Sequence, residues 1–419
     1  MGSKISWLDH SEDDQRRIRE VLQLFSDSGT VDDLGLGTIR DAFSNLIFPG
    51  TSVIQTRARY YLFLPWTYSH FEKKAPNRLV AKGADFERAF IDALRQGGDL
   101  RGIIGINAGR NVKTLPSTIY WNGMVRYGIF TTSGLSLANY GRRVARGATP
   151  PEVEEELASR GATFWNRDIP DPPSGFHKLE PIDFRLSREE AEWLTERITS
   201  TDDQGQHASL LAIALSALRR GEDAPTADHL WEIPLPTSAP SRMVELVHHA
   251  ERFSCAAKGA ALLYNLMLAE RRDRSDDERD VTTPTYYDDE IHDWASWASD
   301  VDLRSWAATT PRMWELLTTS RVRLPLGTRA FVDAWAARIA TIDPFDLGTD
   351  ESSRKLIVDR ELSHKRGQAR FANAKRINQW EGLAGTTAMA YRWPQVRGIL
   401  SDLSDGLREG TKEPADVVA

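Results

Sequence analysis

The sequence predicts a mainly α-helical fold with minor β structure, a multi-helical protein in which one segment has the pattern of a winged-helix-like module. Apolar residues recur at three- and four-residue spacing through most of the 419 residues, whereas two-residue alternation is confined to short stretches such as 102–107 and 127–134. Hydrophobic residues make up 41% and charged residues 27% of the chain, which is typical of a folded soluble protein.

Four segments are predicted in the N-terminal quarter of the chain, and the first and last are amphipathic helices. Ser11 and Asp14 form a helix start that resembles a capping box. Pro49 and Gly50 separate the second segment from a third that is rich in aromatic residues, and Gly97 suits the C-terminal end of the fourth. We expect these segments over residues 11–25, 34–50, 51–74 and 85–98.

A helix followed by a short hairpin arm is predicted next. Pro116 can begin a helix that ends near Tyr127, and residues 129–134 would form the arm. Winged-helix modules place such a helix against a groove of DNA, although the helix can equally serve to bury Trp121 in a core. The candidate contacts are Ser117, Thr118, Asn122 and Arg126.

The rest of the chain is predicted to be helical after a proline-rich connector. Ser187 and Glu190 form a capping box ahead of a helix, and residues 243–272 predict a long, largely buried helix. The tryptophans that follow have the spacing of core residues: Trp294, Trp297, Trp306, Trp314 and Trp335. We expect an N-terminal domain over residues 1–149, a connector over 150–184, a helical domain over 185–350 and a basic helical region over 351–419.

The first of two basic regions begins after Asp99. The net charge of the chain is -7, yet no Asp or Glu occurs before Glu152, while seven arginine and lysine residues do. An acidic side chain beside a phosphate chain would be repelled, which explains the absence of carboxylates if this region meets nucleic acid.

The second basic region runs from Ser352 to Arg397 and holds ten arginine and lysine residues against three acidic ones. In a helix, Arg366, Arg370 and Asn373 would share one face and could follow a row of phosphates. A solvated helix face has the same pattern, so both interpretations stay open.

The stretch from Gly102 to Met124 combines closely spaced glycines with asparagines and paired aromatic residues. Its pattern is neither a P-loop nor a dinucleotide fingerprint, but the free N–H groups of such a loop can bind an anion. Asn107 or Asn122 can hold a water or contact a base edge, and either can instead cap a turn.

Several classes of protein are excluded by the composition. Cys255 is the only cysteine, so neither an intrachain disulfide nor a multi-cysteine metal site is expected, and a reducing cytoplasm fits best. His248 and His249 with Cys255 do not match the spacing of a known metal site, and we expect no metal and no cofactor. No apolar run is long enough to span a bilayer, so we expect no contact with a membrane.

Two resemblances to known families involve these segments. Residues 105–109, Gly-Ile-Asn-Ala-Gly, resemble a motif of the mismatch-specific uracil/thymine DNA glycosylases, in which the Asn positions a water and Pro stands where this chain has Ala108. A broader set of segments resembles an uncharacterised bacterial family found in phage-defence loci, which includes a DNA glycosylase. These segments are residues 6–9, 34–43, 48–60, 116–124 and 391–400.

The resemblance implies a cytoplasmic DNA glycosylase that flips and excises glucosylated hydroxymethylcytosine from double-stranded phage DNA, leaving an abasic site. Asn107 and Asn122 are then candidate catalytic residues, and Tyr60, Tyr120 and Tyr127 are candidates for base stacking. Candidate DNA-binding residues are Arg57, Arg59, Arg110, Lys113, Ser117, Arg126, Lys365, Arg366, Arg370, Lys375 and Arg376. The alternatives are a non-catalytic DNA-binding or interaction protein of a defence system, and a helical scaffold that contacts acidic proteins.

A carboxylate commonly activates the water in such a hydrolysis, and the first basic region contains none. Candidates from elsewhere in the chain are Asp41, Asp288, Asp289 and Glu381. Without one of them, Asn107 would act alone at some cost in rate. The sequence leaves open which base is removed, whether a lyase step follows and how many subunits assemble.

Overall fold

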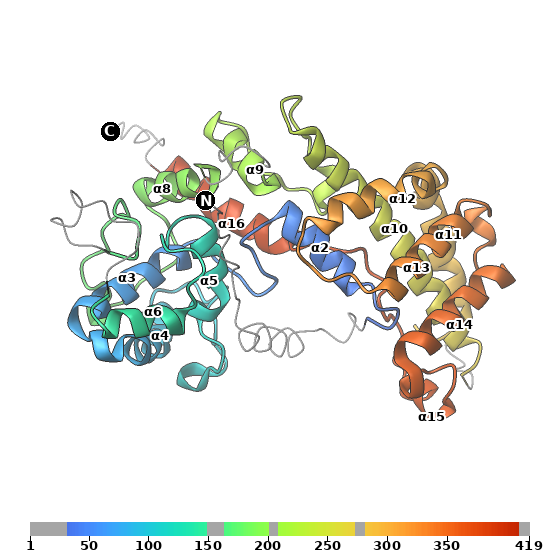
Figure 1. The fold of residues 1–419 in the computed structure, drawn as a ribbon, viewed down its shortest axis with the longest axis horizontal. Coiled ribbons are helices and arrows are strands. Elements are labelled where there is room, and N and C mark those ends of the chain that lie inside the picture. Colours follow the sequence, from blue (N-terminus) through green and yellow to red (C-terminus); the bar gives the residue numbers. More distant parts are fainter. Residues whose placement is uncertain (1–31, 149–162, 201–207, 273–280, 410–419) are drawn as a thin grey trace, which may run out of the picture. The chain divides into compact units, whose positions relative to one another are not determined.

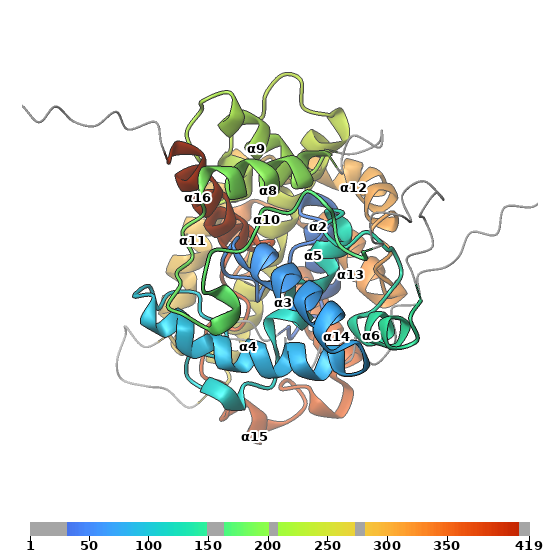
Figure 2. The ribbon, with the colours of Figure 1, turned by 90° about the vertical axis from the view of Figure 1, so that its left-hand side faces the viewer.

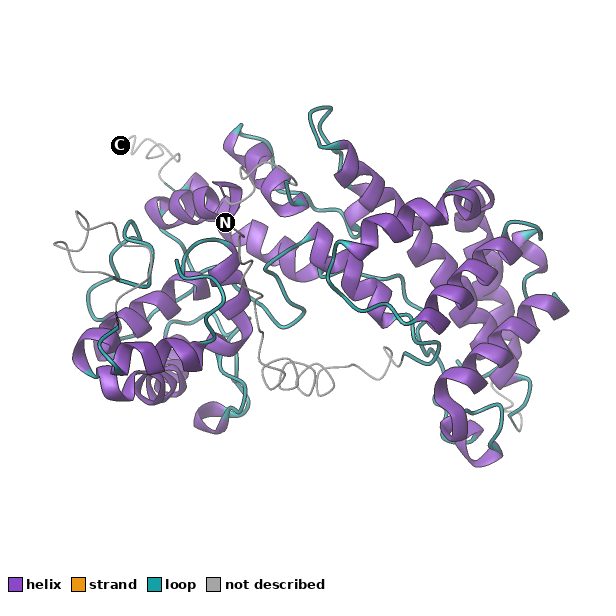
Figure 3. Cartoon of the chain, viewed as in Figure 1, coloured by secondary structure: helices purple, strands orange, loops and turns teal. Residues whose placement is uncertain are grey.

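The structure, a computed structural model, describes residues 32–148, 163–200, 208–272 and 281–409. These residues form fourteen α-helices, and the only β interaction among them is an isolated bridge between Phe130 and Trp165 (Figure 3). The predicted mainly α-helical, multi-helical fold is therefore confirmed. The helix predicted over residues 11–25 lies outside the described residues. Within the described part, no helix is both long and apolar enough to cross a bilayer.

The chain divides into two compact units, each built from segments that lie far apart in the sequence (Figure 1). The described residues of unit 1 are 48–148, 163–200, 208–228 and 392–409, and those of unit 2 are 32–47, 229–272 and 281–391. This division differs from the four consecutive segments that we expected from composition. The first basic region belongs to unit 1, and nearly all of the second belongs to unit 2.

Unit 1 contains seven of the α-helices. They are α3 (Tyr60–Lys74), α4 (Leu79–Gln96), α5 (Pro116–Arg126), α6 (Leu137–Ala145), α8 (Arg188–Ser200), α9 (Leu210–Arg219) and α16 (Trp393–Arg408). Helix α3 packs against α4 and α5, and Figure 2 shows α3 and α4 side by side. Helix α16, from the end of the chain, packs against α8 and α9.

Helix α3 forms the centre of the unit 1 core, because all of residues 60–68 are buried. Phe63 packs with its ring centroid 4.9 Å from that of Phe90 and 5.9 Å from that of Phe176. Phe176 belongs to the segment 150–184 that we expected to be a connector. The described part of that segment therefore contributes to the unit 1 core.

The capping box predicted for the helix after the connector is confirmed in α8. The backbone N–H of Ser187 donates to the Glu190 carboxylate at 3.1 Å, and the N–H of Glu190 donates to Ser187 Oγ at 3.2 Å. The Glu190 carboxylate and Ser187 Oγ thus accept hydrogen bonds from N–H groups that the start of a helix leaves without a backbone partner.

The helix predicted at Pro116 is present as α5, but the hairpin arm predicted after it is wrong. Phe130 forms its β bridge with Trp165, and the N–H of Asn166 donates to the carbonyl of Ile129 at 2.8 Å. The rings of Phe130 and Trp165 are buried beside Tyr140, at centroid distances of 5.2 and 5.8 Å. Burial of these rings favours pairing with a distant segment over a local hairpin.

Unit 2 contains the other seven α-helices. They are α2 (Gly37–Ile47), α10 (Ser241–Ala269), α11 (Pro284–Asp300), α12 (Leu303–Thr318), α13 (Leu326–Ile339), α14 (Glu351–Lys365) and α15 (Ala374–Ile377). The predicted long, buried helix is confirmed as α10, which packs against α2 and against α11 to α14. The tryptophans that we expected in the core are buried, except for the half-buried Trp297.

His249 and Cys255, considered for a metal site, are both buried in α10. His249 Nδ1 accepts a hydrogen bond from Trp306 Nε1 at 3.2 Å, and burial lowers the pKa of His249 to about 4. Burial also raises the pKa of the Cys255 thiol. The two side chains are thus neutral groups in a packed helix.

The helical face predicted for Arg366, Arg370 and Asn373 is wrong. Helix α14 ends at Lys365, and Arg366 adopts a φ of 51°, which takes the chain out of the helix. A short 3-10 turn follows, and the side chain of Asn373 accepts from the N–H of Lys375 at the start of α15. The three side chains therefore do not share one continuous helix.

Candidate nucleic-acid interface

The candidate interface is built on the Gly-rich loop of unit 1, which we define as residues 97–115 between α4 and α5. Gly102 and Gly105 adopt φ values of 79° and 81°. A Cβ on Gly102 would lie 2.6 Å from Arg57 Cγ, and one on Gly105 would lie 2.8 Å from Val112 Cγ2. Both the backbone conformation and the available space require glycine at these positions.

Side chains of unit 1 hold this loop through its backbone. Thr56 Oγ1 donates to the carbonyl of Gly102 at 2.7 Å, and the N–H of Ile104 donates to Tyr60 Oη at 3.0 Å. Arg95 donates to the carbonyl of Ile106. The loop is fixed up to its apex, where Asn107 and Ala108 are exposed.

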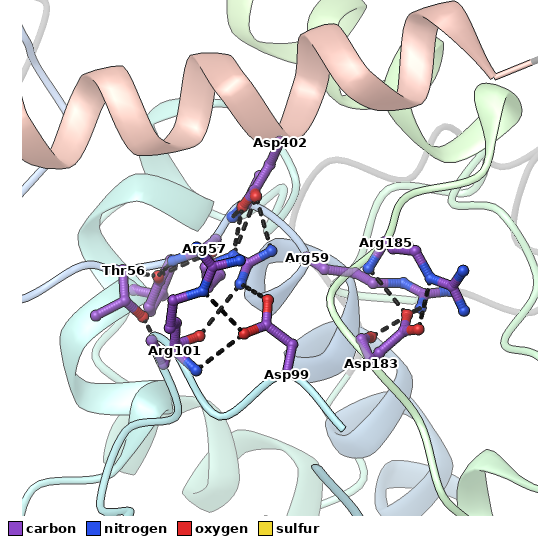
Figure 4. Close-up of polar contacts among 11 residues, drawn as sticks. Thr56, Arg57, Arg59, Asp99, Arg101, Asp183, Arg185 and Asp402 are labelled. Atoms are coloured by element: carbon purple, nitrogen blue, oxygen red, sulfur yellow. Dashed lines mark hydrogen bonds and ion pairs between the residues drawn. The ribbon is translucent and has the colours of Figure 1, made fainter. Parts of the chain in front are cut away.

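Arg57 links this loop to the last helix of the unit. Its Nε donates to both carboxylate oxygens of Asp402 in α16, at 3.0 and 3.1 Å, and its Nη1 donates to Asp99 at 2.8 Å (Figure 4). The N–H of Ala58 also donates to Asp402, at 2.8 Å. We refer to Arg57, Asp99, Asp402 and Arg101, which also pairs with Asp99, as the Arg57 cluster.

The two carboxylates of the cluster have pKa values shifted in opposite directions. The hydrogen bond from Arg57 holds the pKa of Asp99 at about 2, well below its usual range. Burial raises the pKa of Asp402, although Arg57 opposes this shift. Arg57 thus faces a carboxylate that is 29% exposed, Asp99, and one that is 10% exposed, Asp402. The cluster joins three distant segments of the chain.

We predict that Asp99→Asn destabilises the protein at neutral pH and that this difference disappears in acid. A carboxyl group with a lowered folded-state pKa stabilises the fold above its unfolded pKa of about 3.9 and loses this contribution as the pH falls through about 2. Urea unfolding of the wild type and the variant at pH 7, 4 and 2.5 measures the difference. An equal difference at pH 7 and 2.5 would contradict the assignment.

Arg59 is also bound inside unit 1. Its guanidinium donates to the backbone carbonyl of Asp183 at 2.9 Å and to the Glu190 carboxylate at 2.8 Å, and Figure 4 shows it beside Asp183. Arg57 and Arg59, both expected to contact DNA, therefore have internal carboxylate partners in this structure.

The three tyrosines expected to stack on a flipped base are buried. Tyr120 Oη accepts from the N–H groups of Thr56 and Arg57, at 2.8 and 3.0 Å, and Tyr127 Oη donates to the carbonyl of Pro49 at 3.0 Å. Tyr60 packs on Tyr120 with a centroid distance of 5.2 Å. These rings pack against the loops inside the unit 1 core and are not exposed to solvent.

Ser117, a candidate DNA contact, is buried as well. Its N–H donates to the Glu87 carboxylate at 2.7 Å, and its Oγ accepts from Tyr68 Oη at 3.2 Å. Glu87 is itself buried in α4 and takes the place of a capping side chain at the start of α5. Ser117 thus fixes α5 within the unit.

The remaining candidates of unit 1 lie at the surface. The exposed polar and basic residues of the first basic region include Asn107, Asn122, Arg101, Arg110, Lys113, Arg126, Arg142, Arg143 and Arg146. Arg110 pairs with Asp92 at 3.3 Å, with 71% of its side chain exposed. Because exposed pairs of this kind contribute little, such cations stay available to a phosphate.

In unit 2, Asp33 binds two of the five basic residues expected to contact DNA. Lys365 and Arg370 lie 3.2 and 2.6 Å from its carboxylate oxygens. Arg366 and Lys375 are exposed, while Arg376 is half-buried. The second basic region thus keeps fewer free cations than its composition indicates. The carboxylates considered for catalysis, Asp41, Asp288, Asp289 and Glu381, also belong to unit 2.

Sequence reasoning missed the acidic members of the Arg57 cluster. Asp402 stands three residues after Ile399 and one before Leu403, so it borders the apolar face of a strongly amphipathic helix. A charged residue at such a position indicates a buried partner. That signal was present, but nothing local to Asp402 identifies Arg57 as the partner.

These features define a two-unit helical protein in which a fixed Gly-rich loop carries exposed asparagine and basic side chains. The chain belongs to a family of unknown function, DUF6361, which it matches over residues 2–407. Comparisons with curated proteins and with solved structures found no match.

Proposed function

We propose that this protein is a DNA glycosylase that flips and excises a modified cytosine, glucosylated hydroxymethylcytosine, from phage DNA in anti-phage defence. The observation that carries the proposal is the Gly-rich loop: its backbone is anchored and its apex exposes Asn107. The part of the loop that follows Asp99 belongs to a stretch of sequence with seven cations and no carboxylate before Glu152. The resemblance of residues 105–109 to a glycosylase motif supports the same function.

In this mechanism the exposed cations bind phosphates, and the amide of Asn107 orients a water toward C1′ of the flipped nucleotide. The bond from C1′ to the base breaks as the water oxygen adds, and the base leaves with the bonding electrons. Because an amide cannot take the water's proton, that proton goes to solvent, and the departing base takes one up from solvent. Asn107 therefore positions the water but does not act as a base.

The cavity beside Tyr60 is too small to receive a flipped base in this conformation. The cavity lined by Tyr60, Phe90 and Glu87 has a volume of about 10 Å³, which is room for about one water. The tyrosines proposed for stacking would have to be uncovered before they could contact a base.

The buried tyrosines favour a second candidate function, a non-catalytic DNA-binding protein of a defence system. Both functions require a basic surface and DNA affinity that falls with salt. Only the glycosylase produces abasic sites. Incubation with glucosylated phage DNA followed by alkali should cleave the strands if the enzyme is a glycosylase, and unmodified DNA is the control. Intact strands under conditions of full binding would leave only the second function.

We predict that Lys113→Ala weakens duplex binding and lowers the slope of log affinity against log salt by about 1, as expected for the loss of one phosphate contact. Fluorescence anisotropy at several salt concentrations measures this slope. Lys178→Ala, which removes an exposed lysine of the 3-10 turn Phe176–Lys178, is the matched control and should leave the slope unchanged. Equal slopes for the wild type and Lys113→Ala would remove Lys113 from the interface.

A further inference from the structure

Two exposed apolar side chains lie on neighbouring loops of unit 1. Val53 is 40% exposed and Leu100 is 51% exposed, and they are the large apolar residues that the described part of unit 1 leaves exposed. Isolated exposed apolar residues are ordinary. Here, however, both are carried by loops that are bonded to each other, through Thr56 and Gly102 at 2.7 Å and through Arg57 and Asp99 at 2.8 Å.

Val53 lies at the tip of a turn whose own residues are hydrogen-bonded to one another. The N–H of Gln55 donates to the carbonyl of Ser52 at 3.3 Å, and the N–H of Ser52 donates to Gln55 Oε1 at 3.3 Å. Gln55 Nε2 donates to the carbonyl of Gly50 at 3.2 Å. Because the Gln55 amide is buried beneath the turn, the tip faces solvent.

Both flanks of this turn are anchored in unit 1. On one side, Thr51 Oγ1 donates to the carbonyl of Phe48 at 2.7 Å, and Arg392 donates to the carbonyl of Thr51 at 2.8 Å. On the other side, the N–H of Thr56 donates to Tyr120 Oη at 2.8 Å. A β-branched valine on a fixed turn has little conformational freedom to lose when it binds a partner.

One basic side chain follows Leu100, and another lies at the base of the Val53 turn. Arg101 follows Leu100 directly, and 90% of its side chain is exposed. Arg126 lies at the base of the Val53 turn, because a Cβ on Gly50 would stand 3.1 Å from Arg126 Cβ. Exposed apolar side chains with cations nearby are complementary to stacked bases bordered by phosphates.

We propose that Val53 and Leu100 form an apolar wedge that enters a stacked step of duplex DNA while Arg101 and Arg126 bind the adjacent phosphates. This inference rests on the proposed function for the identity of the partner. The wedge would separate two stacked base pairs. This separation must precede any extrusion of a nucleotide.

The test uses a duplex that contains 2-aminopurine, whose fluorescence rises when it is unstacked. The full-length wild type should raise the signal several-fold on binding. Val53→Ser combined with Leu100→Ser should abolish most of the rise while anisotropy still shows salt-sensitive binding. Leu326→Ser, the same change at an exposed leucine of unit 2, should keep the full rise, as should the conservative variant Val53→Ile.

The outcomes separate the two proposals. Binding of the wild type without a fluorescence rise overturns the wedge and leaves DNA binding intact. A full rise that persists in the double serine variant, with an unchanged melting temperature, also overturns the wedge. Failure of the wild type to bind any duplex at low salt overturns the proposed function, and the wedge with it.

Discussion

Arg57→Met is expected to lower the free energy of unfolding by about 3 kcal/mol, the lower end of the cost of removing one partner from a buried ion pair, because the side chains of Arg57 and Asp402 are still 18% and 10% exposed. Methionine keeps most of the length of the side chain but leaves the half-buried Asp402 carboxylate without its cation. The variant also loses the bond to Asp99 and the stacking of the guanidinium on Phe184, which lies 4.7 Å away. Chemical unfolding at neutral pH measures the change.

Arg101→Met is the matched control for this prediction, because Arg101 pairs with the same Asp99 from an exposed position. It should cost less than about 1 kcal/mol, as exposed pairs do. Asp402→Asn should cost less than Arg57→Met, since the amide still accepts a hydrogen bond and no buried charge is left alone. If Arg57→Met and Arg101→Met have equal small effects, the Arg57 cluster does not hold unit 1 together.

Asn107→Ala is expected to lower the rate of base excision by about 100-fold or more, the order of loss seen when a reacting group is no longer held in position. Affinity for duplex DNA should change little, because the variant keeps every cation of the surface. Single-turnover excision assays together with anisotropy separate the two effects.

Two further asparagines serve as references for that variant. Asn111 is exposed in the 3-10 turn Gly109–Asn111 of the same loop, and its replacement by alanine should leave excision unchanged. Asn122 is exposed on α5 and is the other candidate for orienting the water. A large loss in Asn122→Ala with full activity in Asn107→Ala would move the catalytic role from the loop to the helix.

Local signals in the sequence predicted much of the fold. The capping box of Ser187 and Glu190 and the long helix 243–272 depend on spacing within a few turns, and both are present. The hairpin after α5 was wrong because a distant partner decides that segment, and the helical face at Arg366 was wrong because α14 ends at Lys365. Phe130 pairs with Trp165 instead of forming a local turn, and Arg366 adopts a φ of 51° that does not continue the helix.

Only the exposed residues of the candidate site could be predicted from the sequence. Composition indicated the exposed cations and Asn107, since clusters of like charge and loop glycines can be recognised locally. Sequence could not show that Arg57 is bound to Asp402, a residue 345 positions away. The same reason explains the buried tyrosines: Tyr120 is an aromatic residue on a helix face, and only the fold shows that its hydroxyl holds the backbone of Thr56.

Removal of a base from DNA by the exposed Gly-rich loop is best tested by mass spectrometry of the small molecules released from glucosylated phage DNA. We expect free glucosylated hydroxymethylcytosine in the wild-type reaction and almost none with Asn107→Ala. If an excess of wild-type protein that demonstrably binds this DNA releases no free base, the claim is contradicted.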